Sequence, residues 1–531
     1  MARRTHPIPP VTLALVVGMV AVALGACAVG PSTRLDTGVG PVAGPGAAAT
    51  PAGTHALLDS LALARVNDRF DARTGDSAGG RTSSRTSSRT GGRTGDPAAD
   101  ATRPLWAPAR LAIDTARDLR WLDVLRDPTL VGLVTDTVAN NRDLRVAQAR
   151  VREYRAAFGV ARSGFFPQAT ATVARSTNRT VFGPLGFKYN ATQVVGDASL
   201  DLDVWGRTRR GAEATRFDLG AQQEDLRATT LTLVGDVATA YLRIRELDEN
   251  LALADTTLAS RRVTLAIARR RFQQGVTSEL DVRTFEAELA DPATRVATLA
   301  LQRTQQENQL AQLLGRGPTP IPRGRPLAEV VAAVTVPDSI PGAVIAARPD
   351  VRAAARALQA SVARVGAAAA NRLPAVTVSG DYGTQQPGYN NLFRQSGELY
   401  TLQAGLSIPI FTGGRLAGQE REARAQVKQV RGQYEQTVFT AEREANDALA
   451  GVRLGRDQLV AQATQVQALQ RAFGIAQARY RGGVSTYLEL LDAQRQLFTA
   501  QLAFVQDERQ YLVSTVDLYR ALGGGWDGAV R

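Results

Sequence analysis

Histidine, cysteine and methionine are almost absent from this chain of 531 residues. The histidines, His6 and His55, lie in the N-terminal tail, and Cys27 is the single cysteine. The chain therefore lacks the side chains for a Ser-His-Asp triad and for a metal site built on imidazole or thiolate ligands. No disulfide can form within the chain, because it has a single cysteine. Both methionines, Met1 and Met19, lie in the same tail. This argues against a series of methionine thioethers that would bind and pass on copper or silver ions.

Lysine is also scarce, so the net charge of +13 is carried almost wholly by arginine. Lysine occurs only at Lys188 and Lys428. Arginine is spread along every predicted helix, and aromatic stacking residues are not clustered with it, so we expect no nucleic-acid partner. Carboxylate-based hydrolysis would need a concave site that no spacing indicates. We therefore predict no enzyme, no catalytic residue and no metal site.

Residues 1–26 read as a signal peptide, with Arg3 and Arg4 before an apolar run that is too short for a membrane span. The block Leu24-Gly25-Ala26-Cys27 resembles a bacterial lipobox. That resemblance implies a covalent diacylglycerol and an N-acyl chain on Cys27, and we expect no other cofactor. Ala28, in place of aspartate, resembles the signal for sorting to the outer membrane. An ordinary signal peptide with an incidental cysteine is the alternative.

Residues 27–105 are predicted to be a lipid-anchored disordered tether, because segments such as Arg81 to Gly95 carry only Arg, Ser, Thr and Gly. Residues 106–135 form a predicted N-terminal anchoring segment. Within it we expect a helix to start after Asp127, with Pro128 in its first turn.

The sequence from Asp143 to Pro167 recurs at Asp350 to Pro374, an offset of 207 (350 − 143). From Gly206/Gly414 to Gly315/Gly523 the offset is 208 throughout. A one-residue change would rotate the buried stripe of a helix by about 100°, so a constant register predicts long helical hairpins. We assign repeat 1 to residues 136–317 with a hairpin at 208–315, a linker to 318–342, repeat 2 to 343–525 with a hairpin at 416–523, and a tail to 526–531.

Apolar residues recur in each hairpin at three- and four-residue steps, for example Leu233, Val237 and Ala240, as a coiled seam requires. Each hairpin reverses at a glycine, where we expect positive φ, followed by Ser or Thr as the cap of the returning helix. These tips, each with an exposed valine, are Gly275-Val276-Thr277-Ser278 and Gly483-Val484-Ser485-Thr486. Pro292 predicts a kink or short break in the first hairpin only, and hence a different curvature.

Four segments alternate apolar and polar residues with a period of two, which predicts strands at about 168–176, 191–204, 375–383 and 400–411. Loops are expected near 177–189 and 384–400. Leu200 and Leu202 should share one face and Asp201 and Asp203 the other. Four strands cannot close a membrane sheet, but three chains would supply twelve. The alternative is a water-soluble β-layer beside a helical bundle.

Taken together, residues 121 to 525 resemble the TolC-like outer-membrane efflux channels, specifically the lipoprotein outer-membrane factors of tripartite resistance-nodulation-division pumps. The motifs that carry the resemblance are the lipobox followed by Ala28-Val29-Gly30-Pro31, Trp121 through Asp127-Pro128, Arg162-Ser163-Gly164-Phe165-Phe166-Pro167, Val204-Trp205-Gly206-Arg207, Ile408-Pro409-Ile410-Phe411 and the two Gly-Val tips. The resemblance implies a mainly α fold with β: duplicated long helical hairpins forming a trimeric α-barrel, with four strands per chain completing a 12-stranded outer-membrane β-barrel.

The same resemblance implies a homotrimeric, passive exit duct, lipid-anchored in the outer membrane and extending into the periplasm. An inner-membrane resistance-nodulation-division pump would supply the energy. A periplasmic adaptor, the membrane fusion protein, would meet the tips at Gly275, Val276, Thr277, Gly483, Val484 and Ser485. Multidrug resistance is the expected phenotype, while the exported compounds stay open among drugs, dyes, solvents and peptides.

The resemblance also assigns a gate at the periplasmic end. Glu489 and Asp492 match carboxylates of the family's constriction, where three copies would form acidic rings; alternatively they are first-turn acids favoured by the helix dipole. Tyr480 and Asp281 match residues of a latch between hairpins. Ser485 stands where some relatives have arginine, so Arg481 or Arg479 is the expected substitute.

Two other functions remain open. One is an outer-membrane duct for type I secretion of proteins or peptides. The other is a periplasmic coiled-coil structural lipoprotein that conducts nothing, which would not need the paired strands.

Overall fold

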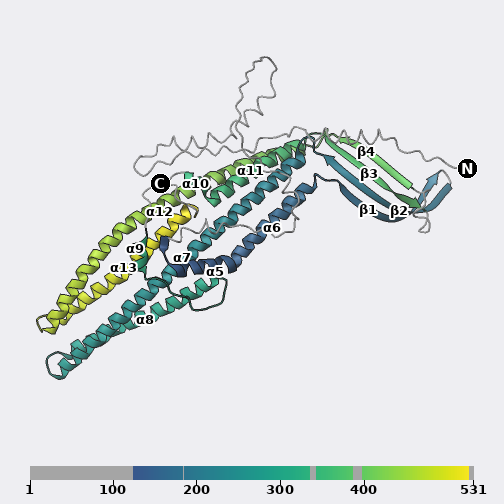
Figure 1. Ribbon diagram of the computed structural model, residues 1–531. Coiled ribbons are helices and arrows are strands. Elements are labelled where there is room, and N and C mark those ends of the chain that lie inside the picture. Colours follow the sequence, from purple (N-terminus) through teal and green to yellow (C-terminus); the bar gives the residue numbers. More distant parts are fainter. Residues whose placement is uncertain (1–123, 183–184, 335–342, 387–397, 525–531) are drawn as a thin grey trace, which may run out of the picture.

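The computed structural model describes residues 124–182, 185–334, 343–386 and 398–524. The molecule is a long rod with a four-stranded sheet at one end and two helical hairpin tips at the other (Figure 1). The predicted signal peptide, the tether with Cys27 and the tail at 526–531 lie outside the described residues, as does most of the anchoring segment.

Two helices lead from the middle of the rod to the sheet: α5 (Pro128–Asn140) and α6 (Arg142–Ser163). The carboxylate of Asp127 accepts hydrogen bonds from the amides of Thr129 and Leu130, and Pro128 is the first helical residue. This is the predicted helix start, and it is confirmed. Asn141 caps α6 and also donates to the carbonyl of Leu313 at 2.8 Å, which fixes the entry of α6 against the first hairpin.

The sheet contains β1 (Gln168–Phe182), β2 (Leu185–Leu202), β3 (Ala375–Gln386) and β4 (Glu398–Ser407), paired antiparallel in the order β1-β2-β3-β4. The four predicted strands are confirmed, but the predicted loop at 177–189 is wrong. Its Gly, Asn and Tyr residues suggest a turn, yet the ladder continues over residues 177–182 and 185–189, with Thr177 opposite Asn190 and their side chains bonded at 2.9 Å. β4 ends before Pro409, which has no N–H for a ladder.

The hairpins are α7 (Arg207–Gln273) with α8 (Glu279–Leu313), and α12 (Arg415–Arg481) with α13 (Tyr487–Ala521). α7 and α12 both have 67 residues and α8 and α13 both have 35, at an offset of 208 (415 − 207). α6 and its copy α11 (Pro349–Ala370) have 22 each at an offset of 207 (349 − 142). The constant register therefore reflects rigid, equal helices, as predicted.

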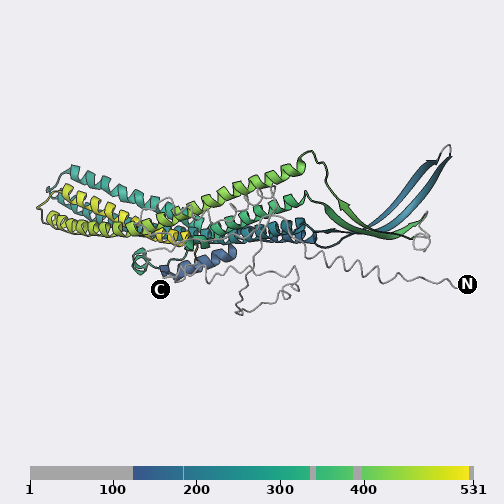
Figure 2. The same ribbon diagram turned by 90° about the horizontal axis from the view of Figure 1, so that it is seen from above.

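The hydrophobic core lies at the middle of the rod, where α5, α7, α13 and the short helix α9 (Leu327–Ala333) meet, beside α10 (Ala343–Ala347) (Figure 1). Residues of the predicted seam such as Val237, Ile244 and Leu247 are at most 1% exposed. The two hairpins also run alongside each other toward the tips (Figure 2). No helix of the described residues is both long and apolar enough to cross a membrane.

Pro292 lies inside α8, and the helix runs unbroken through it. The predicted short break is therefore wrong, whereas the kink and the difference in curvature stay predictions. A proline at position 292 leaves the carbonyl of Glu288 without its helical N–H donor. Arg261 of α7 donates its Nη1 to that carbonyl instead, which explains why the helix tolerates the proline.

Candidate functional site at the hairpin tips

Both tips have the same backbone geometry. Gly275 and Gly483 each have φ of +74°, as predicted. The next residue, Val276 or Val484, donates its N–H back to the carbonyl of Arg271 or Arg479 at 2.9 and 3.0 Å. These bonds close a Schellman motif, which satisfies the last carbonyls of α7 and α12.

The tips expose apolar side chains at matching places. Val276 is 70% exposed and Val484 is 74% exposed, and Leu280 and Leu488, four residues later, are 75% and 68% exposed. Single exposed apolar residues are common on protein surfaces, but here the same pair is repeated on both hairpins. Each tip thus offers a small apolar contact surface.

The returning helices are capped differently. Ser278 caps α8 in a capping box with Asp281, whose carboxylate also accepts from the Thr277 hydroxyl at 2.6 Å. Hydrogen bonds from Thr277 and Ser278 hold the pKa of Asp281 below its usual value. Thr486 makes no side-chain cap to α13, so the predicted cap is confirmed at the first tip and wrong at the second.

Tyr480 packs beneath a residue that the sequence reasoning missed, Arg271. The guanidinium of Arg271 lies 5.0 Å from the ring centroid and donates to the carbonyls of Tyr480 and Arg481, each at 3.4 Å. Burial raises the pKa of Tyr480; the charge of Arg271 lowers it and that of Asp281 raises it. Arg271 therefore joins the first hairpin to the second, whereas Asp281 serves its own helix cap. The signal in the sequence that could have pointed to this contact is the run Arg269-Arg270-Arg271 at the end of the first long helix.

The two predicted gate carboxylates lie on the first turns of α13 and are exposed. Glu489 pairs with Arg479 at 3.5 Å, and Asp492 accepts from Gln496 at 2.6 Å. Arg479, one expected substitute for the missing latch arginine, is therefore paired within its own hairpin. The acidic rings need several copies of the chain and stay a prediction.

A hydrophobic cluster joins the hairpins above the tips. Its buried members are Leu265, Ala268, Val282, Phe285, Ala476, Tyr480 and Leu490. The ring centroids of Phe285 and Tyr487 lie 3.7 Å apart. Since these residues come from all four long helices, the tips of one chain form a single packed unit.

At the opposite end, the sheet has one apolar and one polar face. The register places Val194, Ala198, Leu200 and Leu202 of β2 on the same face as Val376 and Val378 of β3 and Leu402 and Leu406 of β4. Asp197, Asp201, Asp381 and Gln403 lie on the other face. Within the described residues, β1 and β4 each have one edge without a partner strand. Such edges favour pairing with another chain.

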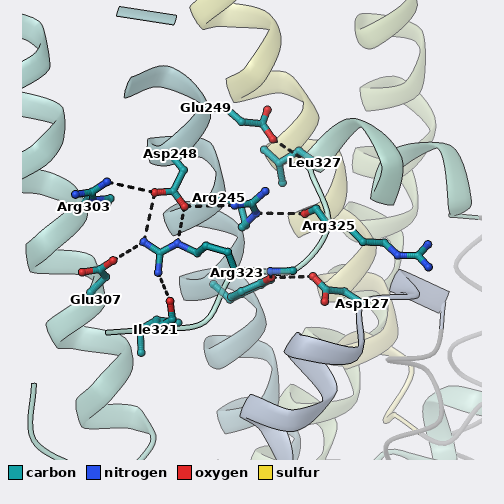
Figure 3. A network of polar contacts seen from close by, with 12 residues as sticks. Asp127, Arg245, Asp248, Glu249, Arg303, Glu307, Ile321, Arg323, Arg325 and Leu327 are labelled. Carbon is teal, nitrogen blue, oxygen red and sulfur yellow. Dashed lines mark hydrogen bonds and ion pairs between the residues drawn. The ribbon is translucent and has the colours of Figure 1, made fainter. Parts of the chain in front are cut away.

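A polar network fastens the linker between the repeats to the middle of α7 (Figure 3). Asp248 lies between three guanidinium groups, those of Arg323 at 2.6 Å, Arg245 at 3.4 Å and Arg303 at 3.7 Å. Arg323 also binds the carboxylate of Glu307 on α8. One linker arginine therefore contacts both helices of the first hairpin.

The same network reaches the N-terminal segment. The hydroxyl of Tyr241 donates to Asp127 at 2.8 Å and accepts from the amide of Gly324 at 2.8 Å. Glu249 accepts from the amide of Leu327 at 2.9 Å, which begins α9. A Cβ at position 324 would lie 2.2 Å from Oδ1 of Asp127, so any larger residue there would displace the Asp127 carboxylate from its hydrogen bonds. Within the described residues, no three His, Cys, Asp or Glu side chains are grouped to hold a metal ion.

The chain matches the model of the outer membrane efflux protein family over residues 133–316 and 340–524. The toluene efflux pump outer membrane protein TtgC of Pseudomonas putida is 33% identical over 431 residues, which cover 80% of this chain and 88% of TtgC. The cation efflux system protein CusC of Escherichia coli is 29% identical over 425 residues, covering 78% of this chain and 90% of CusC.

Solved structures agree with the fold. The structure of CusC matches with a TM-score of 0.71 at 28% identity, covering 75% of this chain and 93% of that chain. The open-state channel MtrE of Neisseria gonorrhoeae matches with a TM-score of 0.68 at 29% identity, covering 75% and 90%. The predicted family, its mainly helical fold with a small sheet and its lack of enzymatic activity are thereby confirmed. The chain belongs to the outer membrane efflux protein family and is an outer-membrane efflux component.

Proposed function

We propose that the chain forms a passive, homotrimeric exit duct, gated at its periplasmic end and opened by a periplasmic adaptor and an inner-membrane resistance-nodulation-division pump. The observation that carries the proposal is the combination, in one rod, of an apolar-faced sheet with unpaired edges and two apolar helical tips at the far end. In a single copy, β1 and β4 each leave one edge unpaired within the described residues, and the apolar side chains of the tips are exposed.

Three copies would satisfy the sheet. Joining β1 of one copy to β4 of the next closes twelve strands, removes every free edge and turns the apolar face outward to lipid. The polar face, with Asp197, Asp201 and Asp381, would then line an aqueous path. The helical hairpins would continue that path as a tunnel.

The tips support an adaptor contact and a gate. Val276 and Val484 are exposed beside Gly275, Thr277, Gly483 and Ser485, and apolar surface of this kind favours a protein partner. Threefold copies of Glu489 and Asp492, with Tyr480 and Asp281 behind them, would narrow the path and favour cations. Arg271, which binds the second hairpin at Tyr480 and Arg481, would take the role that the family resemblance implies for a latch arginine.

The lipobox supports an anchor. A diacylglycerol and an N-acyl chain on Cys27 would hold the protein in the outer membrane with the hairpins in the periplasm, since two or more acyl chains anchor a protein stably. No other cofactor is proposed. Relatives at 33% identity are named for toluene and antibiotic efflux pumps, which supports small organic compounds as cargo.

Purification of the full-length protein from outer membranes, followed by imaging and by conductance in planar bilayers, tests the proposal. We expect a threefold particle with an axial channel, and expression with a cognate adaptor and pump should restore drug resistance in a strain lacking its own outer-membrane component. Val484→Asp should abolish resistance but leave the trimer intact. Isolated monomers without an axial hole would contradict the proposal.

A further inference from the structure

Glu288 lies about two and a half turns from the start of α8 and binds arginines of both hairpins. Its Oε2 lies 3.1 Å from Nη1 of Arg261 on α7, and its Oε1 lies 2.6 Å from Nη2 of Arg495 on α13. The side chain of Arg261 is 5% exposed and that of Glu288 is 15% exposed. One largely buried carboxylate thus bridges the two hairpins, away from the Arg271 contact at the tips.

Pro292 makes this arrangement possible. Because proline lacks an N–H, the carbonyl of Glu288 has no donor within α8. Arg261 donates Nη1 to this carbonyl as well as to the carboxylate of the same residue. Arg261 is therefore held by two acceptors of one residue, and Glu288 keeps its second carboxylate oxygen for Arg495.

The second copy lacks the whole arrangement. At the offset of 208 (415 − 207), the arginine, the carboxylate and the proline of the first copy are replaced by Leu469, Gln496 and Ala500. All three positions differ in the second copy, so the arrangement belongs to the first hairpin alone.

Buried polar atoms lie near this contact. The hydroxyl of Tyr487 and Nε of Arg261 are buried and have no hydrogen-bond partner among the described residues. Burial, with the nearby charge of Glu288, raises the pKa of Tyr487 to about 12. Separation of the hairpins here would leave Glu288 facing Arg261 alone and open the cluster around Phe285. The Arg261–Glu288 pair is buried, whereas the side chain of Arg495 is 59% exposed, so solvent partly screens the contact that crosses between the hairpins.

We propose that Glu288 is a positioning residue that ties the first hairpin to the second above the tips, and that Arg261 and Pro292 hold it in place. The inference rests on the proposed gated duct, in which the two hairpins must move relative to each other. It adds a closing contact at a different level from Arg271 and the acidic residues.

The test uses the full-length protein with spin labels at positions 276 and 484, one on each tip. Glu288→Gln keeps the shape of the side chain and removes its charge. We expect the distribution of label distances to shift to longer values and the conducting fraction in bilayers to rise about tenfold, the change that 1.4 kcal/mol produces. Glu286→Gln is the matched control, because Glu286 also binds two arginines, Arg269 and Arg283, but both belong to the first hairpin.

Two further variants separate a specific contact from general damage. Arg495→Gln should increase the distance between the tips as Glu288→Gln does. The double variant should show no greater distance than Glu288→Gln alone, because both single changes remove the same Glu288–Arg495 ion pair. Pro292→Ala restores a backbone N–H at position 292. This N–H should compete with Arg261 for the carbonyl of Glu288 and partly increase the distance between the tips. Ala500→Pro, with Leu469 instead of arginine opposite, should lower the yield of folded protein.

The outcomes are distinct for the two proposals. Native label distances in both Glu288→Gln and Arg495→Gln would overturn the role of Glu288 even if the native protein conducts. A native protein that never conducts would overturn the duct, whereas the label distances would still report whether Glu288 joins the hairpins. Equal widening in Glu286→Gln would show general loosening and would also overturn the inference.

Discussion

Arg323 of the linker donates hydrogen bonds to both carboxylate oxygens of Asp248 on α7, with Nε 2.6 Å from Oδ2 and Nη2 3.3 Å from Oδ1. Its guanidinium also reaches Glu307 on α8 and the carbonyl of Ile321 (Figure 3). The linker between the repeats is therefore fixed to the first hairpin at a defined height, near the core of the rod.

Arg323→Gln should lower the free energy of unfolding by about 1 to 3 kcal/mol, because charged hydrogen bonds to two acidic residues are lost. Thermal melting of the purified protein in detergent measures the change. Arg283→Gln is the control: its ion pairs with Glu279 and Glu286 lie on the surface, where solvent screens them, so little stability should be lost. Equal losses in both variants would refute the role of the linker contact.

Arg271→Gln should loosen the tips, because it removes the guanidinium from the face of Tyr480, a contact that contributes about 0.5 to 2 kcal/mol. Cells expressing the variant should admit large antibiotics that the native protein excludes. Tyr480→Phe keeps the ring beneath Arg271 and should remain close to native. If Tyr480→Phe leaks as strongly as Arg271→Gln, the hydroxyl rather than the ring face carries the contact.

Glu508 should make stability depend on pH. Burial, reinforced by the charge of Glu249, raises its pKa from 4.5 to about 7. Between these values the folded state holds the proton and the unfolded chain releases it, so the free energy of unfolding falls as pH rises. The stabilisation present below pH 4.5 is lost by about pH 7, roughly 2 kcal/mol after allowance for solvent screening.

Glu508→Gln removes this titration. Melting temperatures at about pH 5 and about pH 8 should differ less in the variant than in the native protein, and at the higher pH the variant should be the more stable of the two. The same pH dependence in both proteins would show that another group is responsible.

Leu402→Arg should reduce assembly in the outer membrane, because Leu402 lies on the apolar face of β4 and is 69% exposed. A charge facing lipid costs about 2 to 4 kcal/mol at mid-membrane depth. Gln403→Arg, on the opposite face of the same strand, should assemble normally. The yield of folded trimer in outer-membrane extracts compares the two, and equal yields would argue against the assignment of the faces.

Local signals in the sequence were sufficient for the main elements. The matched offsets predicted helices of equal length, and Gly275 and Gly483 predicted both reversals because each needs positive φ. The alternation around Leu200 predicted the face on which it lies. The turns and the alternation depend on residues close together in the chain, and the equal helix lengths follow from a repeat that is visible in the sequence itself.

The contacts between hairpins could not be predicted in the same way. Arg271 and Tyr480 are 209 positions apart, and Glu288 and Arg495 are 207 apart. Arginine is spread along all the long helices, so no pattern in the sequence marks which arginine makes a contact across the interface between the hairpins. The unbroken course through Pro292 was missed for the same reason, because the donor that replaces its N–H comes from another helix.

The proline, carboxylate and arginine found only in the first hairpin also bear on how a threefold ring could deform. A trimer would contain six hairpins, and six identical hairpins would deform to the same extent and widen the ring evenly. With three hairpins stabilised by this contact and three that lack it, the deformation would concentrate in one set. The opening would then change while the rest of the wall keeps its shape.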